Sequence, residues 1–298
     1  MLVHRPKDMF SNNKKLILEN EDIDTYKLSI ARNICRKFYS FLIDKLNAAE
    51  KRALVLSKYK NQYRNQVVYL GDLCFVGGSK GYLFILPFGL DSKTININII
   101  ICKNLPDNSK DMGAYDSDTK IIYIRLLDQD YITINTIRKV KSMRYILIHE
   151  AVHLLDDIEK QDPQFFNYNK GYYQSEAEFN AHFNEFLDFI NQRILSDIEN
   201  FKDLSAFCNK EYVEKLLANI LYGSGNFITL SNDYEDYDEL MSLKDFFRKL
   251  SFEDKEKLLQ QLVDYYTKTF KDIRRNWRGK TKEEKFNEAI ECLYPLFN

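Results

Sequence analysis

The residues with the clearest chemical potential lie in a segment that contains the pattern HExxH, formed by His149, Glu150 and His153. In an α-helix, residues four positions apart differ by about 40° in direction and are separated by about one turn. Both imidazoles would therefore point to one side and could share one metal ion, with Glu150 next to the first of them. A zinc ion lowers the pKa of a bound water toward about 7, and a neighbouring glutamate can take the proton. The pattern predicts a zinc site that activates water.

The helix expected to carry this pattern is apolar around most of its circumference. Its apolar positions are Ile146, Leu147, Ile148, Ala151, Val152, Leu154 and Leu155. Such a helix should be buried, and buried imidazoles and carboxylates destabilise a fold unless partners satisfy them. A metal ion with its water is one such partner. Ordinary hydrogen bonds to protein groups are the alternative, since isolated HExxH matches do occur.

A catalytic zinc ion needs a third protein ligand and an open fourth position. The candidates lie in GYYQSEAEFNAHFNEF, residues 171–186. Glu178 and His182 are four apart and share a face of the expected helix, and we take Glu178 as the third ligand. Ser175 and Glu178 also match a capping box, in which Glu178 would only accept a hydrogen bond from the Ser175 amide. Glu176 and His182 are the remaining candidates for the ligand.

Two supporting roles follow from the chemistry of such a site. Metal-bound histidines usually donate their second N–H to a carboxylate, and Asp156 or Asp157 could accept it. A solvated helix end is the equal alternative for both aspartates. The negative charge that develops on the substrate oxygen also needs a donor. Tyr172, Tyr173 and His182 are nearby, and we name Tyr173 and His182 as catalytic residues beside Glu150; His182 could instead be a core histidine or a partner of Glu178.

At these residues the sequence resembles the zincin metallopeptidases, and among them the gluzincins, which carry HExxH on one helix and a glutamate on a later one. The stretch SEAEFNAHF is similar to the ExxA helix of small bacterial and phage zinc peptidases. It is more distantly similar to the EANxFA segment of ImmA/IrrE-like regulatory peptidases. The resemblance covers roughly residues 95–190. Neither the GxxNExxSD segment of thermolysin-type enzymes nor the HxxGxxH extension of metzincins is present.

The resemblance implies roles for individual residues and a shape for the core. His149 and His153 would be ligands, Glu150 the base and Glu178 the third ligand, while Asp157 falls where some gluzincins carry an aspartate. In that family a β-sheet precedes the HExxH helix, and its edge strand pairs with extended substrate. The segment KIIYIRL (Lys120–Leu126) falls where that edge strand would lie.

The remaining sequence predicts an α+β fold in three parts. Residues 1–66 form an N-terminal tail and helices, and residues 67–160 hold a small mixed β-sheet and the HExxH helix. Residues 161–298 form a helical lobe that supplies the third ligand. The strands are expected in VVYLGDLCFV, YLFILPF, TININIIIC and KIIYIRL, and a cap at Asn135 or Thr136 is expected to open the HExxH helix. GGSKG should form a hairpin turn, and Thr281 with Glu284 matches a capping box.

Composition narrows the setting of this chemistry. The 298 residues carry 43 Lys+Arg and 44 Asp+Glu, for a formal charge of -1, so no global attraction to nucleic acid or membranes is expected. Five dispersed cysteines without a CxxC pair fit a reducing compartment. The absence of a signal-like segment and of a long apolar run predicts a cytoplasmic protein, or a virion-associated one if a phage encodes it. The basic run around Trp277 could contact nucleic acid, with Trp277 stacked on a base, but it is interpreted as a solvated helix end and nucleic acid is not an expected partner.

The sequence thus predicts a zinc-dependent endopeptidase, with Zn²⁺ as cofactor and a protein or peptide as substrate. A structural or regulatory protein on a zincin fold, such as a virion component with a protein assembly partner, is the alternative. A peptidase that cleaves a repressor in the ImmA/IrrE manner is a third hypothesis. Iron, manganese and cobalt also bind to two histidines and a glutamate, and zinc is the default from the ligand types.

Overall fold

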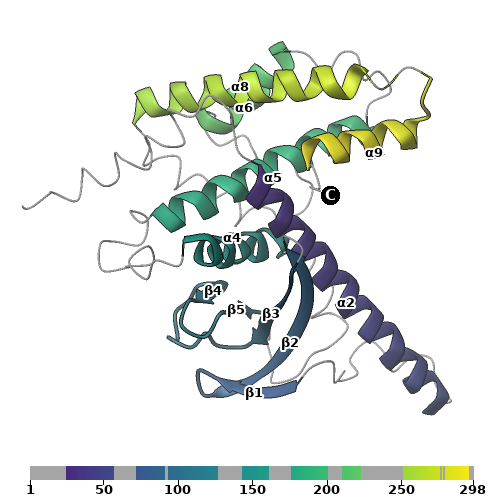
Figure 1. Ribbon diagram of the computed structural model, residues 1–298, viewed down its shortest axis with the longest axis vertical. Coiled ribbons are helices and arrows are strands. Elements are labelled where there is room, and N and C mark those ends of the chain that lie inside the picture. Colours follow the sequence, from purple (N-terminus) through teal and green to yellow (C-terminus); the bar gives the residue numbers. More distant parts are fainter. Residues whose placement is uncertain are drawn as a thin grey trace, which may run out of the picture. The chain divides into compact units, whose positions relative to one another are not determined.

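The structure is a computed structural model that combines helices with one β-sheet (Figure 1). It describes residues 25–56, 72–90, 93–126, 143–160, 176–200, 210–222, 251–275, 277 and 279–294. The chain divides into two compact units, one formed by Ile30–Phe166 and the other by Met1–Ser29 with Asn167–Asn298. The mixed α and β content confirms the fold class expected from the sequence.

A curled five-stranded sheet forms the centre of the unit Ile30–Phe166 (Figure 1). Its strands are β1 (Asp72–Val76), β2 (Ser79–Leu90), β3 (Lys93–Cys102), β4 (Gly113–Asp116) and β5 (Ile121–Arg125). They stand in the order β1-β2-β3-β5-β4, with β3 and β5 parallel and the other pairs antiparallel. Gly77 and Gly78, both with positive φ, make the turn between β1 and β2, which confirms the hairpin predicted there.

Two helices of this unit, α2 (Tyr26–Leu56) and α4 (Arg144–Lys160), cover one face of the sheet. Phe84, Ile99, Ile122 and Tyr115 follow one another across the paired strands, so their side chains share that face. Phe38 of α2 packs edge-on against Phe84, at 5.6 Å between ring centroids. Helix α4 contacts β4 and β5. The sheet therefore presents its β4 end to the helix that carries HExxH.

The edge strand at this end is β4, and the expectation that Lys120–Leu126 would be the edge is wrong. Strand β5, which lies within that segment, is paired on both sides, with β3 and with β4. GAYD was not among the strands expected from the sequence, because a four-residue strand with a glycine and an aspartate has weak β-propensity. Pairing with β5 makes it a strand. In the turn that follows, Asp116 Oδ1 accepts hydrogen bonds from the amides of Asp118 and Thr119.

The unit that contains Asn167–Asn298 is helical in its described part (Figure 1). Its helices are α5 (Glu176–Asn200), α6 (Lys210–Tyr222), α8 (Phe252–Arg275) and α9 (Lys282–Leu293). A buried polar chain joins three of them: Tyr266 Oη donates to Asn191 Oδ1 at 2.7 Å, and Asn191 Nδ2 donates to the Leu293 carbonyl at 3.1 Å. Because buried polar groups must be satisfied, these bonds fix how α5, α8 and α9 pack.

The helix boundaries largely follow the sequence predictions. The capping box of Thr281 and Glu284 is confirmed, with both of its hydrogen bonds formed. Helix α4 begins at Arg144, and the cap expected at Asn135 or Thr136 lies outside the described residues. Trp277 is buried, so its ring is not presented for stacking on a base. Within the described part of the chain, no helix has the length and apolar character needed to cross a membrane.

Candidate metal centre

The two histidines of α4 converge as the helical spacing predicts. His149 Nε2 and His153 Nε2 are 3.2 Å apart, and both side chains are buried. A tetrahedral zinc ion with nitrogen ligands at about 2.0–2.1 Å holds those nitrogens about 3.3 Å apart. The two imidazoles therefore already have the separation of a ligand pair. In a protein without an ion, the same geometry is an imidazole–imidazole hydrogen bond, in which one ring donates and the other accepts.

Glu150 lies on the same helix with its carboxylate against edge strand β4. Its side chain is buried, and a Cβ built on Gly113 would lie 2.7 Å from Glu150 Oε1 and 3.0 Å from Glu150 Cγ. The carboxylate thus occupies the space that a side chain at Gly113 would take. A carboxylate here, on the helix of the two histidines and against the terminal strand of the described sheet, could exchange a proton with a water molecule.

Asp157 is held by groups of the sheet. It is buried, so it does not belong to a solvated helix end, and its carboxylate accepts hydrogen bonds from Tyr115 Oη and Lys120 Nζ. Both donors belong to the β4–β5 hairpin, so Asp157 fastens this hairpin to α4. The neighbouring Asp156 is fully buried as well, which also excludes a solvated helix end for it.

Helix α5 carries Glu178 and His182 one turn apart, and both side chains are buried. His182 Nδ1 lies 3.0 Å from Oε2 of the buried Glu185. Because a carboxylate is an acceptor, Nδ1 carries the hydrogen of this pair. Nε2, on the far side of the ring from Glu185, is the nitrogen that can interact with another group. Sequence reasoning missed Glu185, although its spacing of three from His182 places the two on one helix face.

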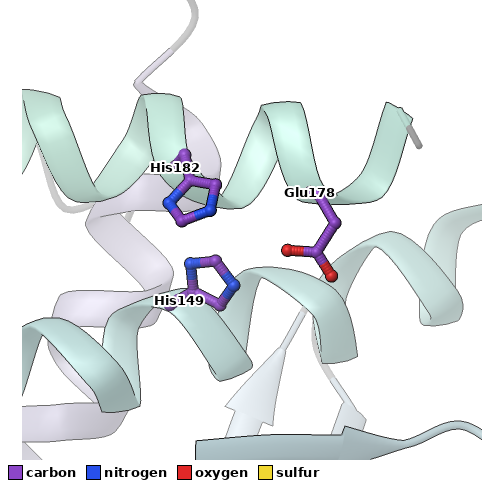
Figure 2. Close-up of side chains that lie close together, drawn as sticks. All are labelled: His149, Glu178 and His182. Carbon is purple, nitrogen blue, oxygen red and sulfur yellow. The ribbon is translucent and has the colours of Figure 1, made fainter. Parts of the chain in front are cut away.

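Three of these side chains form a group that could bind a metal ion: His149, Glu178 and His182 each offer one ligand atom, all within 4.8 Å of one another (Figure 2). All three are buried. Imidazole nitrogen and carboxylate oxygen are donors that zinc takes, so the chemistry of the group fits the expected cofactor.

This group overlaps the ligand set expected from the sequence without matching it. His149 and Glu178 belong to both sets. The third member expected from the sequence is His153, which lies beside His149, whereas the third member of the group in the structure is His182. Three protein ligands leave a tetrahedral ion one open position, whereas four close it. Whether His182 acts as a ligand therefore bears directly on function. Tyr172, Tyr173 and Ser175 lie outside the described residues, as does the side chain of Glu176, so the structure leaves the oxyanion role of Tyr173 and the capping alternative as predictions.

Three comparisons with known proteins, covering family models, curated proteins and solved structures, find no match to this chain. The function proposed below therefore rests on the residues and the geometry of this site.

Proposed function

We propose that this protein is a metal-dependent endopeptidase, with zinc as its ion and Glu150 as its general base. The observation that carries the proposal is the Glu150 carboxylate, which is buried against strand β4 and belongs to the helix on which His149 and His153 converge. A structural histidine pair does not need a carboxylate at this position, whereas hydrolysis by an activated water does.

His149, His153 and Glu178 would hold the ion in this proposal. When bound, a divalent ion at such a site supplies Lewis acidity, which polarises a carbonyl group and makes water more acidic. Glu150 would take a proton from the attacking water and deliver it to the nitrogen of the departing amine. His182, with its Nδ1–H held by Glu185, would in its imidazolium form donate from Nε2–H to the carbonyl oxygen, where negative charge develops.

Strand β4 supplies a place for an extended peptide. It is the terminal strand of the described sheet, so the backbone groups on its outer side have no partner strand among the described residues. An added strand would form backbone hydrogen bonds there, and these recognise a peptide chain independently of its side chains. Gly113 of this strand touches Glu150, so a peptide paired with β4 would pass close to the proposed base.

Turnover by a Glu150→Gln variant tests the proposal. The amide keeps the size of the side chain and one accepting oxygen but cannot take up a proton. We expect the variant to fold and to bind zinc like the wild type, and to lose about 10²- to 10⁴-fold in the rate of peptide hydrolysis. A mixture of unstructured peptides read by mass spectrometry serves as substrate. Full activity in Glu150→Gln would refute the proposed mechanism.

One observation favours a second function. The ligand atom of His182 belongs to the group with His149 and Glu178, and a fourth protein ligand would leave an ion no open position. The chain would then be a structural or regulatory protein with a closed metal site. His182→Ala separates the two functions: loss of zinc affinity supports the closed site, while retained zinc with reduced turnover supports the peptidase.

A further inference from the structure

Gly113 is the glycine of strand β4 that faces α4. Its backbone is not the reason for a glycine, because the positive-φ glycines among the described residues are Gly77, Gly78 and Gly279. An alanine could therefore adopt the Gly113 conformation. Space is the reason: an added Cβ would lie 2.5 Å from Ile146 Cγ2 and 2.7 Å from Glu150 Oε1. Both separations are shorter than those that real Cβ atoms show.

Strand β4 cannot easily move away from α4 to make room for a side chain at position 113. Gly113 is paired with Ile124, and the Arg125 amide donates to the Met112 carbonyl at 2.8 Å, so the start of β4 is held in register. Two residues further along, Tyr115 is hydrogen-bonded to Asp157 of α4. Strand and helix are thus fastened to each other close to the contact. The soft element that remains is the carboxylate end of Glu150, because it is the far end of a flexible side chain.

We infer that Gly113 is a positioning residue for Glu150: the missing side chain creates the space in which the carboxylate lies against the edge strand. This inference rests on the proposed function, since it assigns a role in holding the general base. A methyl group at position 113 would push the carboxylate away from the strand edge and press on the β-branched Ile146, whose side chain has little rotamer freedom in a helix. Neither His149 nor His153 is among the nearest atoms that this methyl group would meet.

Gly113→Ala tests the inference, with Gly89→Ala as the matched control. Gly89 lies on strand β2, and a Cβ there meets no atom within 4 Å. We expect Gly113→Ala to bind zinc in the wild-type amount, to keep a similar KM and to lose at least tenfold in kcat, while Gly89→Ala behaves like the wild type. Wild-type kcat in Gly113→Ala would overturn the inference and leave the proposed function standing.

A double-mutant cycle, read by urea unfolding, tests the contact of position 113 with Ile146 and Glu150 and needs no peptidase activity. The change Gly113→Ala is made in the wild type and in an Ile146→Ala/Glu150→Ala background, which lacks the atoms that the new methyl would meet. We expect a clear fall in the urea midpoint in the wild type and little or no fall in the background. An equal fall in both would overturn the inference. If the wild type shows no peptidase activity, the proposed function fails while the cycle still decides the role of Gly113. If Gly113→Ala alone does not fold, folding of the triple variant supports the contact and its failure contradicts it.

Discussion

The hydrogen bonds of Asp157 should contribute strongly to stability, and the structure indicates how much. Asp157→Ala removes the acceptor of Tyr115 Oη and of Lys120 Nζ. Tyr115 is 8% exposed, so its hydroxyl would lose its acceptor in a buried place, which costs about 1–3 kcal/mol. The side chain of Lys120 is 54% exposed, and an ion pair screened to this extent contributes about 0–1 kcal/mol. We expect Asp157→Ala to lower the free energy of unfolding by about 1–4 kcal/mol.

Urea unfolding of three variants separates the two contributions. Tyr115→Phe should cost more than Lys120→Met, because the hydroxyl is buried and the ammonium group is half exposed. Glu211→Ala is the control: its ion pair with Lys215 lies on the surface, so no measurable change is expected. A cost of Asp157→Ala below about 1 kcal/mol would refute the reasoning. So would a loss that appears in Lys120→Met and not in Tyr115→Phe.

Four further predictions concern other side chains. Glu185→Gln weakens the hold on His182 Nδ1; if His182 is a ligand, zinc affinity in equilibrium dialysis should fall about 10- to 100-fold. Thr281→Ala removes the N-cap of α9 and should cost about 0.5–2 kcal/mol in urea unfolding. Hydrogen bonds from Thr281 lower the pKa of Glu284 below its ordinary 4.5, so the contribution of this carboxylate should be present above that pH and disappear as the pH falls through the lowered pKa. Burial raises the pKa of Cys102 to about 12, so this thiol should resist alkylation at pH 8 in the folded protein and react after unfolding, as read by mass spectrometry.

Local periodicity explains what could be predicted of the candidate site. The convergence of His149 and His153 follows from the geometry of one helix and needs no knowledge of the rest of the fold. The same holds for Glu178 and His182, and the spacing of Glu185 would have allowed its prediction. The capping box of α9 was readable for the same reason, because all its groups lie within one turn.

Contacts between distant segments explain what could not be predicted. Strand β4 is short and contains residues that rarely favour strands, and it exists because β5 pairs with it. Asp157 accepts hydrogen bonds from Tyr115 and Lys120, which lie about 40 residues earlier in the chain. No local sequence pattern predicts these contacts. The need for a glycine at position 113 likewise comes from the packing of α4 against β4, which no local pattern predicts.

Metal content tests the central claim most directly. Plasma mass spectrometry of the purified protein, beside a His149→Ala/His153→Ala variant, gives the amount of metal per chain. We expect about one zinc ion per chain in the wild type and none in the variant, because the variant lacks two imidazoles of the proposed site. Absence of stoichiometric metal in the wild type, even after zinc is added at neutral pH, would contradict the account and favour a structural role for the HExxH helix.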